Sequence, residues 1–252
     1  MSATVRFGTL GLAVAATWMA SATPSAASDI AQDKEALAPL QTYVGSWRGV
    51  GQLRRGSSRG AWREATEWSW RFDDGRAALV ADVTGAKYFA KLRLQAGKQP
   101  GEYVLVATPA AKKGAPQAPT KPVHFTGQRE DGTLVLTADE QLDELPARIT
   151  IRMVAGGDRM VVLYQKQLGG DRFARLGEVG ATRHGSSFAK VAAVGHECVV
   201  TGGLGTIVVE FQGKKYYVCC GGCRDLFDED PAGVLAEYQQ RKADQRATDQ
   251  KK

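Results

Sequence analysis

Short alternating segments, separated by turn residues, fill the chain between Val44 and Arg183. In "ARITIRM", for example, Ile149, Ile151 and Met153 fall on one face and polar residues on the other. This period-two alternation is typical of antiparallel strands with one buried face. Turn signals such as "DDG", "EDG" and two copies of "GGD" recur between the segments. About ten short strands without intervening helices predict a mainly β fold, either a barrel or a sandwich.

Two short motifs resemble the signature of lipocalin-like β-barrels. Gly45-Ser46-Trp47 opens the first expected strand, and Arg183 in "GEVGATRHG" closes the last one. In such barrels the arginine stacks on the tryptophan at the closed end, where the guanidinium covers the indole face. The resemblance therefore implies a lipocalin-like antiparallel barrel over residues 38–186, with Trp47 and Arg183 in a structural role. Residues 29–44 are expected to form a short helix across one barrel end.

The first residues have the pattern of a secretory signal peptide. Arg6 precedes an apolar run from Phe7 to about Ala20, and "SAA" at 25–27 fits a small-x-small cleavage site. The apolar run is too short for a membrane span, which takes about 20 residues. We therefore predict a signal peptide over residues 1–27 and an exported protein without a membrane span. The barrel resemblance is to bacterial proteins, which makes the periplasm or the medium the expected location.

The chain has 4 cysteines, and three of them lie together in "YYVCCGGC". Cys219 and Cys220 end an expected strand, two glycines form an expected tight turn, and Cys223 lies near the start of an expected helix. The helix N-terminus is expected to lower the pKa of the Cys223 thiol. Cys198 precedes the hairpin and is expected to fold back beside this corner. Thiolates that converge in this way suit Cu(I), Zn(II) or a heavier thiophilic ion.

The residues around these thiols resemble the TRASH domain, a relative of the YHS domain. These modules are small ββα, treble-clef-like units associated with trafficking, resistance and sensing of heavy metals. The resemblance implies a metal-binding module over residues 191–242 with one Cu(I) or Zn(II) ion per chain. The ligands that the resemblance implies are Cys198, Cys219 and Cys223, with Cys220 beside them as an alternative ligand. Apart from the resemblance, His196, two residues before Cys198, is a further candidate ligand through its imidazole. The matching pieces are Cys198 with Thr201–Gly202, Gly213–Lys214, Tyr216–Tyr217, Cys219, Cys220, Cys223, Phe227 and Pro231.

Disulfides are the alternative use of these thiols. Four cysteines in an exported protein can form two disulfide bonds. Adjacent Cys219 and Cys220 are poor partners for each other, because a vicinal bond strains the peptide between them. Cys198 would then pair with one of them and Cys223 with the other.

The sequence offers little for catalysis or for nucleic-acid binding. It has 3 histidines and no Gly-x-Ser-x-Gly motif. The net charge of +6 comes without an Arg/Lys cluster interleaved with aromatic residues. We therefore predict a non-enzymatic metal-binding protein for capture, delivery or resistance. The alternative is a barrel that binds a small apolar ligand, with the cysteine residues as a structural metal or disulfide clip.

Overall fold

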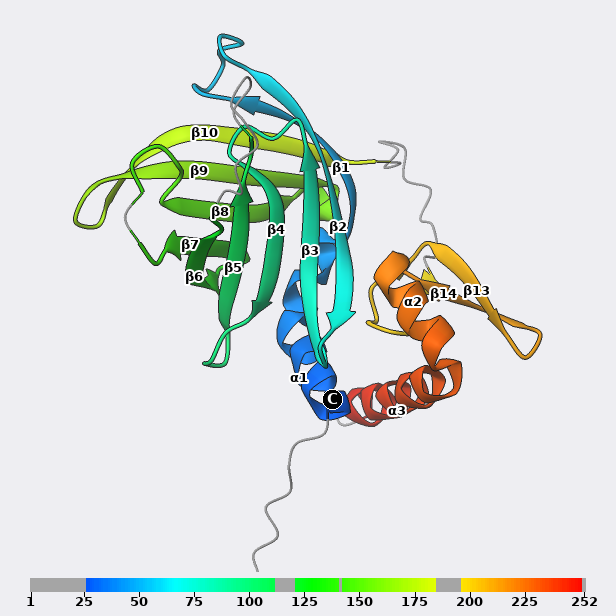
Figure 1. Cartoon of the computed structure of the whole chain (residues 1–252). Coiled ribbons are helices and arrows are strands. Elements are labelled where there is room, and N and C mark those ends of the chain that lie inside the picture. The colour runs from blue at the N-terminus through cyan, green and yellow to red at the C-terminus, as the bar shows by residue number, and fades with distance from the viewer. Residues whose placement is uncertain (1–25, 112–120, 141, 185–195, 251–252) are drawn as a thin grey trace, which may run out of the picture.

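The computed structural model describes residues 26–111, 121–140, 142–184 and 196–250. A closed antiparallel barrel is the larger part, and a smaller part with two helices follows it (Figure 1). The prediction of a mainly β fold with an antiparallel barrel is confirmed. The predicted signal peptide lies outside the described residues, except that its last two positions begin the first helix.

Each barrel strand pairs with the next one along the chain, and the first closes the barrel against the last. Short turns join several of these neighbours directly as hairpins, such as β2 with β3 and β6 with β7. The strands are β1 (Gly45–Gln52), β2 (Trp62–Asp73), β3 (Arg76–Thr84), β4 (Phe89–Ala96), β5 (Glu102–Pro109), β6 (Val123–Glu130), β7 (Thr133–Ala138), β8 (Arg148–Val154), β9 (Arg159–Gly169) and β10 (Arg172–Arg183), with a 3-10 turn η2 (Ala155–Gly157) between β8 and β9.

The alternating residues fill the barrel interior. Ile149 and Ile151 are only 2% exposed, as their period-two spacing predicts. Arg152, the residue after Ile151 in β8, is exposed. Aromatic rings and leucines share the core with them, and Phe89 packs edge-on against Phe125 with ring centres 5.6 Å apart. The barrel is therefore held together by a core of large apolar side chains.

A helical segment precedes the barrel, as predicted. It consists of α1 (Ala26–Leu37) and the 3-10 helix η1 (Ala38–Tyr43). Helix α1 packs on β3 and β4, and Leu37 and Leu40 are fully buried there.

The arginine–tryptophan contact predicted for the closed end is present. The Arg183 guanidinium lies 4.2 Å from the centre of the Trp47 ring, and these two residues also pair in register between β1 and β10. Arg183 donates hydrogen bonds to the backbone oxygens of Thr42, Val44 and Gly157. The same side chain thus joins η1, the start of β1 and the turn before β9.

Residues 196–250 form a second compact unit, called the cysteine module below. The predicted hairpin is present, and Asp230 caps the last helix by accepting a hydrogen bond from the backbone N–H of Gly233 at 2.9 Å. None of the helices in the described ranges is both long and apolar enough to cross a membrane. The elements are β11 (His196–Glu197), β12 (Leu204–Gly205), β13 (Ile207–Phe211), β14 (Lys214–Val218), α2 (Gly221–Glu229) and α3 (Pro231–Asp249).

The cysteine module packs directly on the barrel. The start of α2 lies against β2, and α3 passes close to α1, where Lys34 pairs with Glu237 at 2.7 Å (Figure 1). A Cβ atom on Gly222 would lie 1.8 Å from the backbone oxygen of Trp70, so only glycine permits this approach. The two glycines were expected to form a tight turn, but they form the first turn of α2 instead. The close approach to β2 explains the glycine at 222.

Candidate metal centre

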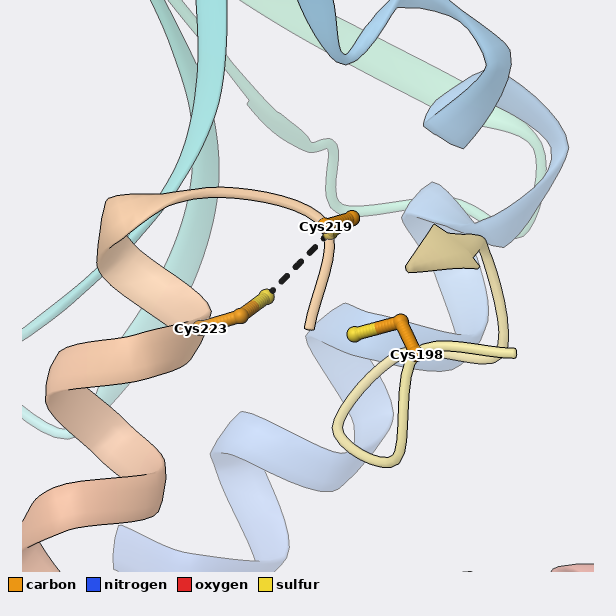
Figure 2. Close-up of side chains that lie close together, drawn as sticks. All are labelled: Cys198, Cys219 and Cys223. Carbon is orange, nitrogen blue, oxygen red and sulfur yellow. Dashed lines mark hydrogen bonds between the residues drawn. The ribbon is translucent and has the colours of Figure 1, made fainter. Parts of the chain in front are cut away.

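Three cysteine side chains converge where β14 meets α2. Cys219 directly follows β14, Cys223 lies in the first turn of α2, and Cys198 follows β11 (Figure 2). Their sulfur atoms all lie within 4.8 Å of one another. Among the described residues, this is the one group of three or more Cys, His, Asp or Glu side chains with such spacing. The predicted approach of Cys198 to the strand-to-helix corner is therefore confirmed.

The three cysteines of the centre differ in exposure. Cys198 and Cys223 are fully buried, whereas Cys219 is half-buried. The Sγ atoms of Cys219 and Cys223 are 3.5 Å apart, and the Thr201 hydroxyl lies 3.6 Å from the Cys219 sulfur. All four cysteines are free thiols in this structure.

A tight turn brings Cys198 to the other two ligands. The backbone N–H of Cys198 donates to Gly203 and that of Gly202 donates back to Cys198, at 2.7 and 2.8 Å. Gly202 has a φ of 76°, a conformation that glycine adopts without steric cost. The next residue, Val199, donates to the backbone oxygen of Tyr217 in β14. These bonds fix the turn beside the end of β14, which is where Cys219 follows.

The thiols of the centre share protons through hydrogen bonds. Hydrogen bonds from Cys219 and Cys223 lower the pKa of Cys198, while burial raises the pKa of Cys223. The sequence predicts a lowered pKa for Cys223, but the pKa is raised, because burial and hydrogen bonds with Cys198, Cys219 and Cys220 favour the protonated thiol. A bound cation would replace the shared protons, since thiols bind metals as thiolates.

Cys220 lies beside this group and also contacts the barrel. Its sulfur accepts a hydrogen bond from the backbone N–H of Trp70 at 3.3 Å, and it lies 3.9 Å from the Cys219 sulfur. Cys220 is buried but is not part of the mutually close group. Its contact with Trp70 gives it a role in joining the cysteine module to β2.

His196 is also outside the group of three. Its ring is exposed and stacks on the ring of Tyr217, with centres 3.5 Å apart and planes 3° from parallel. The structure therefore brings together three of the five residues predicted as ligands. It also places two side chains beside the centre that the sequence did not indicate as functional, the Thr201 hydroxyl and the guanidinium of Arg241.

Comparisons with known proteins add little to this geometry. No family model matches the chain, and no curated protein matches it. Among solved structures, the chain is similar to the crystal structure of Rv2717c from M. tuberculosis, with a TM-score of 0.36 and 14% sequence identity. That match covers 59% of this chain and 96% of the other.

Proposed function

We propose that the protein is an exported, non-enzymatic protein that binds one thiophilic metal ion through Cys198, Cys219 and Cys223. The observation that carries this proposal is the mutual approach of the three sulfur atoms within 4.8 Å. Sulfur atoms at such spacing can all bind one ion, because metal–sulfur bonds are about 2.3 Å long. An exported protein with such a centre serves metal capture, delivery or resistance.

The ligand set favours Cu(I) over Zn(II). Structural zinc sites almost always have four protein ligands in a tetrahedron. Here Cys220 accepts a hydrogen bond from Trp70 and is outside the mutually close group, and His196 stacks on Tyr217. Soft thiolate ligands select Cu(I), which binds well with three of them.

The resemblance to TRASH and YHS domains supports the same proposal. Its three ligand positions are the three cysteines that converge, and its tyrosines and Phe227 pack within the cysteine module. Tyr216 lies against Phe227 with ring centres 6.0 Å apart, and Phe227 is 1% exposed. The module is a small one, and units of this size often need a metal or disulfides to fold. Part of the ion's binding energy would then stabilise the module.

The test is metal stoichiometry under anaerobic conditions, measured with thiol counting on protein that lacks residues 1–27. We expect about one Cu(I) per chain in the wild type and a loss of high-affinity binding in Cys223→Ser. Cys220→Ser is the matched control, because this buried residue is outside the group of three and a serine hydroxyl can still accept the hydrogen bond from the Trp70 N–H; it should keep the ion. Equal stoichiometry in the wild type and in Cys223→Ser would refute the proposal.

A second candidate function is the binding of a small molecule in the barrel. One observation favours it: the carboxyl group of Glu64 accepts a hydrogen bond from the indole N–H of Trp62 at 2.9 Å, among aromatic rings. Tyr88, just before β4, and Tyr164 in β9 pack there with ring centres 4.8 Å apart, although β4 and β9 are not neighbours in the barrel. Nile red fluorescence that rises with the wild type and not with Trp62→Ala would support this function. No change with either protein would count against it.

A further inference from the structure

Arg241, on helix α3, holds the backbone of the turn that carries Cys198. Its guanidinium donates hydrogen bonds to three successive backbone oxygens, those of Cys198, Val199 and Val200, at 3.4, 3.1 and 3.4 Å. The three peptide groups therefore direct their oxygens toward one cation. A planar guanidinium can serve several acceptors at once, whereas the ammonium group of lysine acts as a point charge.

Other contacts hold Arg241 in this place. Its guanidinium lies 3.7 Å from a carboxylate oxygen of Glu197 and 5.3 Å from the centre of the Tyr238 ring. The Nε atom is buried and has no hydrogen-bond partner among the described residues, so the terminal nitrogens make the contacts with the turn. Lys242 binds the other oxygen of Glu197 at 2.9 Å. Arg241 is thus fixed by its own helix and by the residue that precedes Cys198.

We propose that Arg241 is a positioning residue of the metal centre, because it bridges the three carbonyls of the turn and so keeps the Cys198 sulfur beside Cys219 and Cys223. This inference rests on the proposed function. Helix α3 carries no cysteine, yet by this proposal its Arg241 helps to hold the metal centre in place. The positive charge of Arg241 also stabilises the metal-bound centre, because three thiolates around one Cu(I) or divalent ion carry a net negative charge.

The neighbouring residue provides a matched control. Lys242→Met removes one positive charge from the same helix and one partner from Glu197, but Lys242 has no bond to the turn at Cys198. Arg241→Met removes the same charge together with the three bonds to the carbonyls. Arg241→Lys keeps the charge and the helix propensity but loses the planar fork.

The experiment is an anaerobic titration of the full mature chain with Cd(II), followed by the ultraviolet absorption of cadmium–thiolate bonds. We expect Arg241→Met and Arg241→Lys to bind Cd(II) roughly tenfold to a hundredfold more weakly than the wild type, the usual cost of losing a group that orients a ligand. Lys242→Met should stay within about threefold of the wild type. The absorption per bound ion should also fall in Arg241→Met, because fewer thiolates bind.

A double-mutant cycle separates positioning from general stabilisation of the module. In a Cys198→Ser background, adding Arg241→Met should change the Cd(II) affinity by less than about twofold, because the ligand that Arg241 positions is already gone. An equal loss in both backgrounds would overturn the proposal, as would Arg241→Lys that binds like the wild type. A wild type that takes up no Cd(II) would instead refute the proposed function itself.

Discussion

The Cys220 sulfur accepts a hydrogen bond from the backbone N–H of Trp70, at 3.3 Å, across the contact between the cysteine module and β2. The same contact brings Gly222 against the backbone oxygen of Trp70. A cysteine that would be expected to bind metal thus secures the start of α2 to the barrel wall. The position of Cys223, in the first turn of that helix, depends on this contact.

Gly222→Ala should therefore destabilise the contact between the two parts. Alanine is better than glycine in a helix by about 1 kcal/mol, so helix propensity alone predicts stabilisation. The new Cβ atom would lie 1.8 Å from a backbone oxygen in β2, and α2 must move to relieve this overlap. We expect faster hydrogen exchange in α2 and weaker metal binding.

Gly221→Ala is the control for that experiment. It lies in the same turn of α2, and a Cβ atom there would meet nothing within 4 Å. It should leave hydrogen exchange in α2 unchanged or slow it slightly. Equal behaviour of the two variants would show that α2 does not sit against β2 in solution.

Arg183→Met should lower the free energy of unfolding of the barrel by about 2–3 kcal/mol, because it removes the cation over the Trp47 ring and the hydrogen bonds to three carbonyls. Arg152→Met is the comparison, since Arg152 is exposed on β8 and should change stability by less than about 0.5 kcal/mol. Urea unfolding monitored by tryptophan fluorescence measures both. Losses of similar size would argue against a special role for Arg183.

Asp33 should make the barrel's stability fall at low pH. Burial opposes its ionisation, but hydrogen bonds from Arg76 and from the Ala77 backbone outweigh burial and lower its pKa. A lowered pKa in the folded state stabilises the protein above the unfolded pKa of about 3.9, and this contribution is lost as pH falls through the folded value. Asp33→Asn should cost about 1–3 kcal/mol at pH 7 and much less at the lowest pH at which the protein stays folded.

Glu35→Gln, on the exposed face of the same helix, should leave the pH profile unchanged. The measurement is urea unfolding at a series of pH values. A constant difference between the wild type and Asp33→Asn across the series would contradict the assignment to the Asp33 carboxylate.

Glu64 should have the opposite pH dependence. Burial raises its pKa, and the hydrogen bond from Trp62 only partly offsets this. A carboxyl group with a raised folded pKa costs stability once the unfolded state ionises, so the wild type loses stability as pH rises from about 4.3 through the folded pKa. Glu64→Gln can still accept from Trp62 and avoids that loss. It should be more stable than the wild type at pH 8 and not at pH 4.

Thermal unfolding at the two pH values measures this effect, with Glu130→Gln as an exposed control that should give no pH-dependent difference. A Glu64→Gln variant that is less stable than the wild type at pH 8 would show that the ionised carboxylate is favourably placed.

The barrel could be predicted from the sequence because its signals are local. Period-two alternation marks each strand, and the turns between strands join neighbours, so the order of the sheet follows the chain. The two motif residues, Trp47 and Arg183, then mark the strands that close it. The number of strands and the closed end both follow from patterns a few residues long.

The centre could be predicted only in part. Cys219 and Cys220 are consecutive residues directly after β14, yet only Cys219 belongs to the group of three close sulfur atoms. Which of them meets Cys198 depends on the turn that follows β11, and which meets the barrel depends on how α2 packs on β2. Neither contact is local, and the same holds for Arg241, whose bonds reach back to a turn more than 40 residues earlier.

The partial exposure of Cys219 has a consequence for exchange of the ion. In the proposed metal centre Cys198 and Cys223 are buried, so an incoming thiol or an acceptor protein would first reach the ion at the partly exposed Cys219. Transfer through a mixed-ligand intermediate would thus begin at one atom and proceed in a fixed order. The rate of handover, and with it the choice of acceptor, would be set by the surface around Cys219 rather than by the affinity of the whole centre.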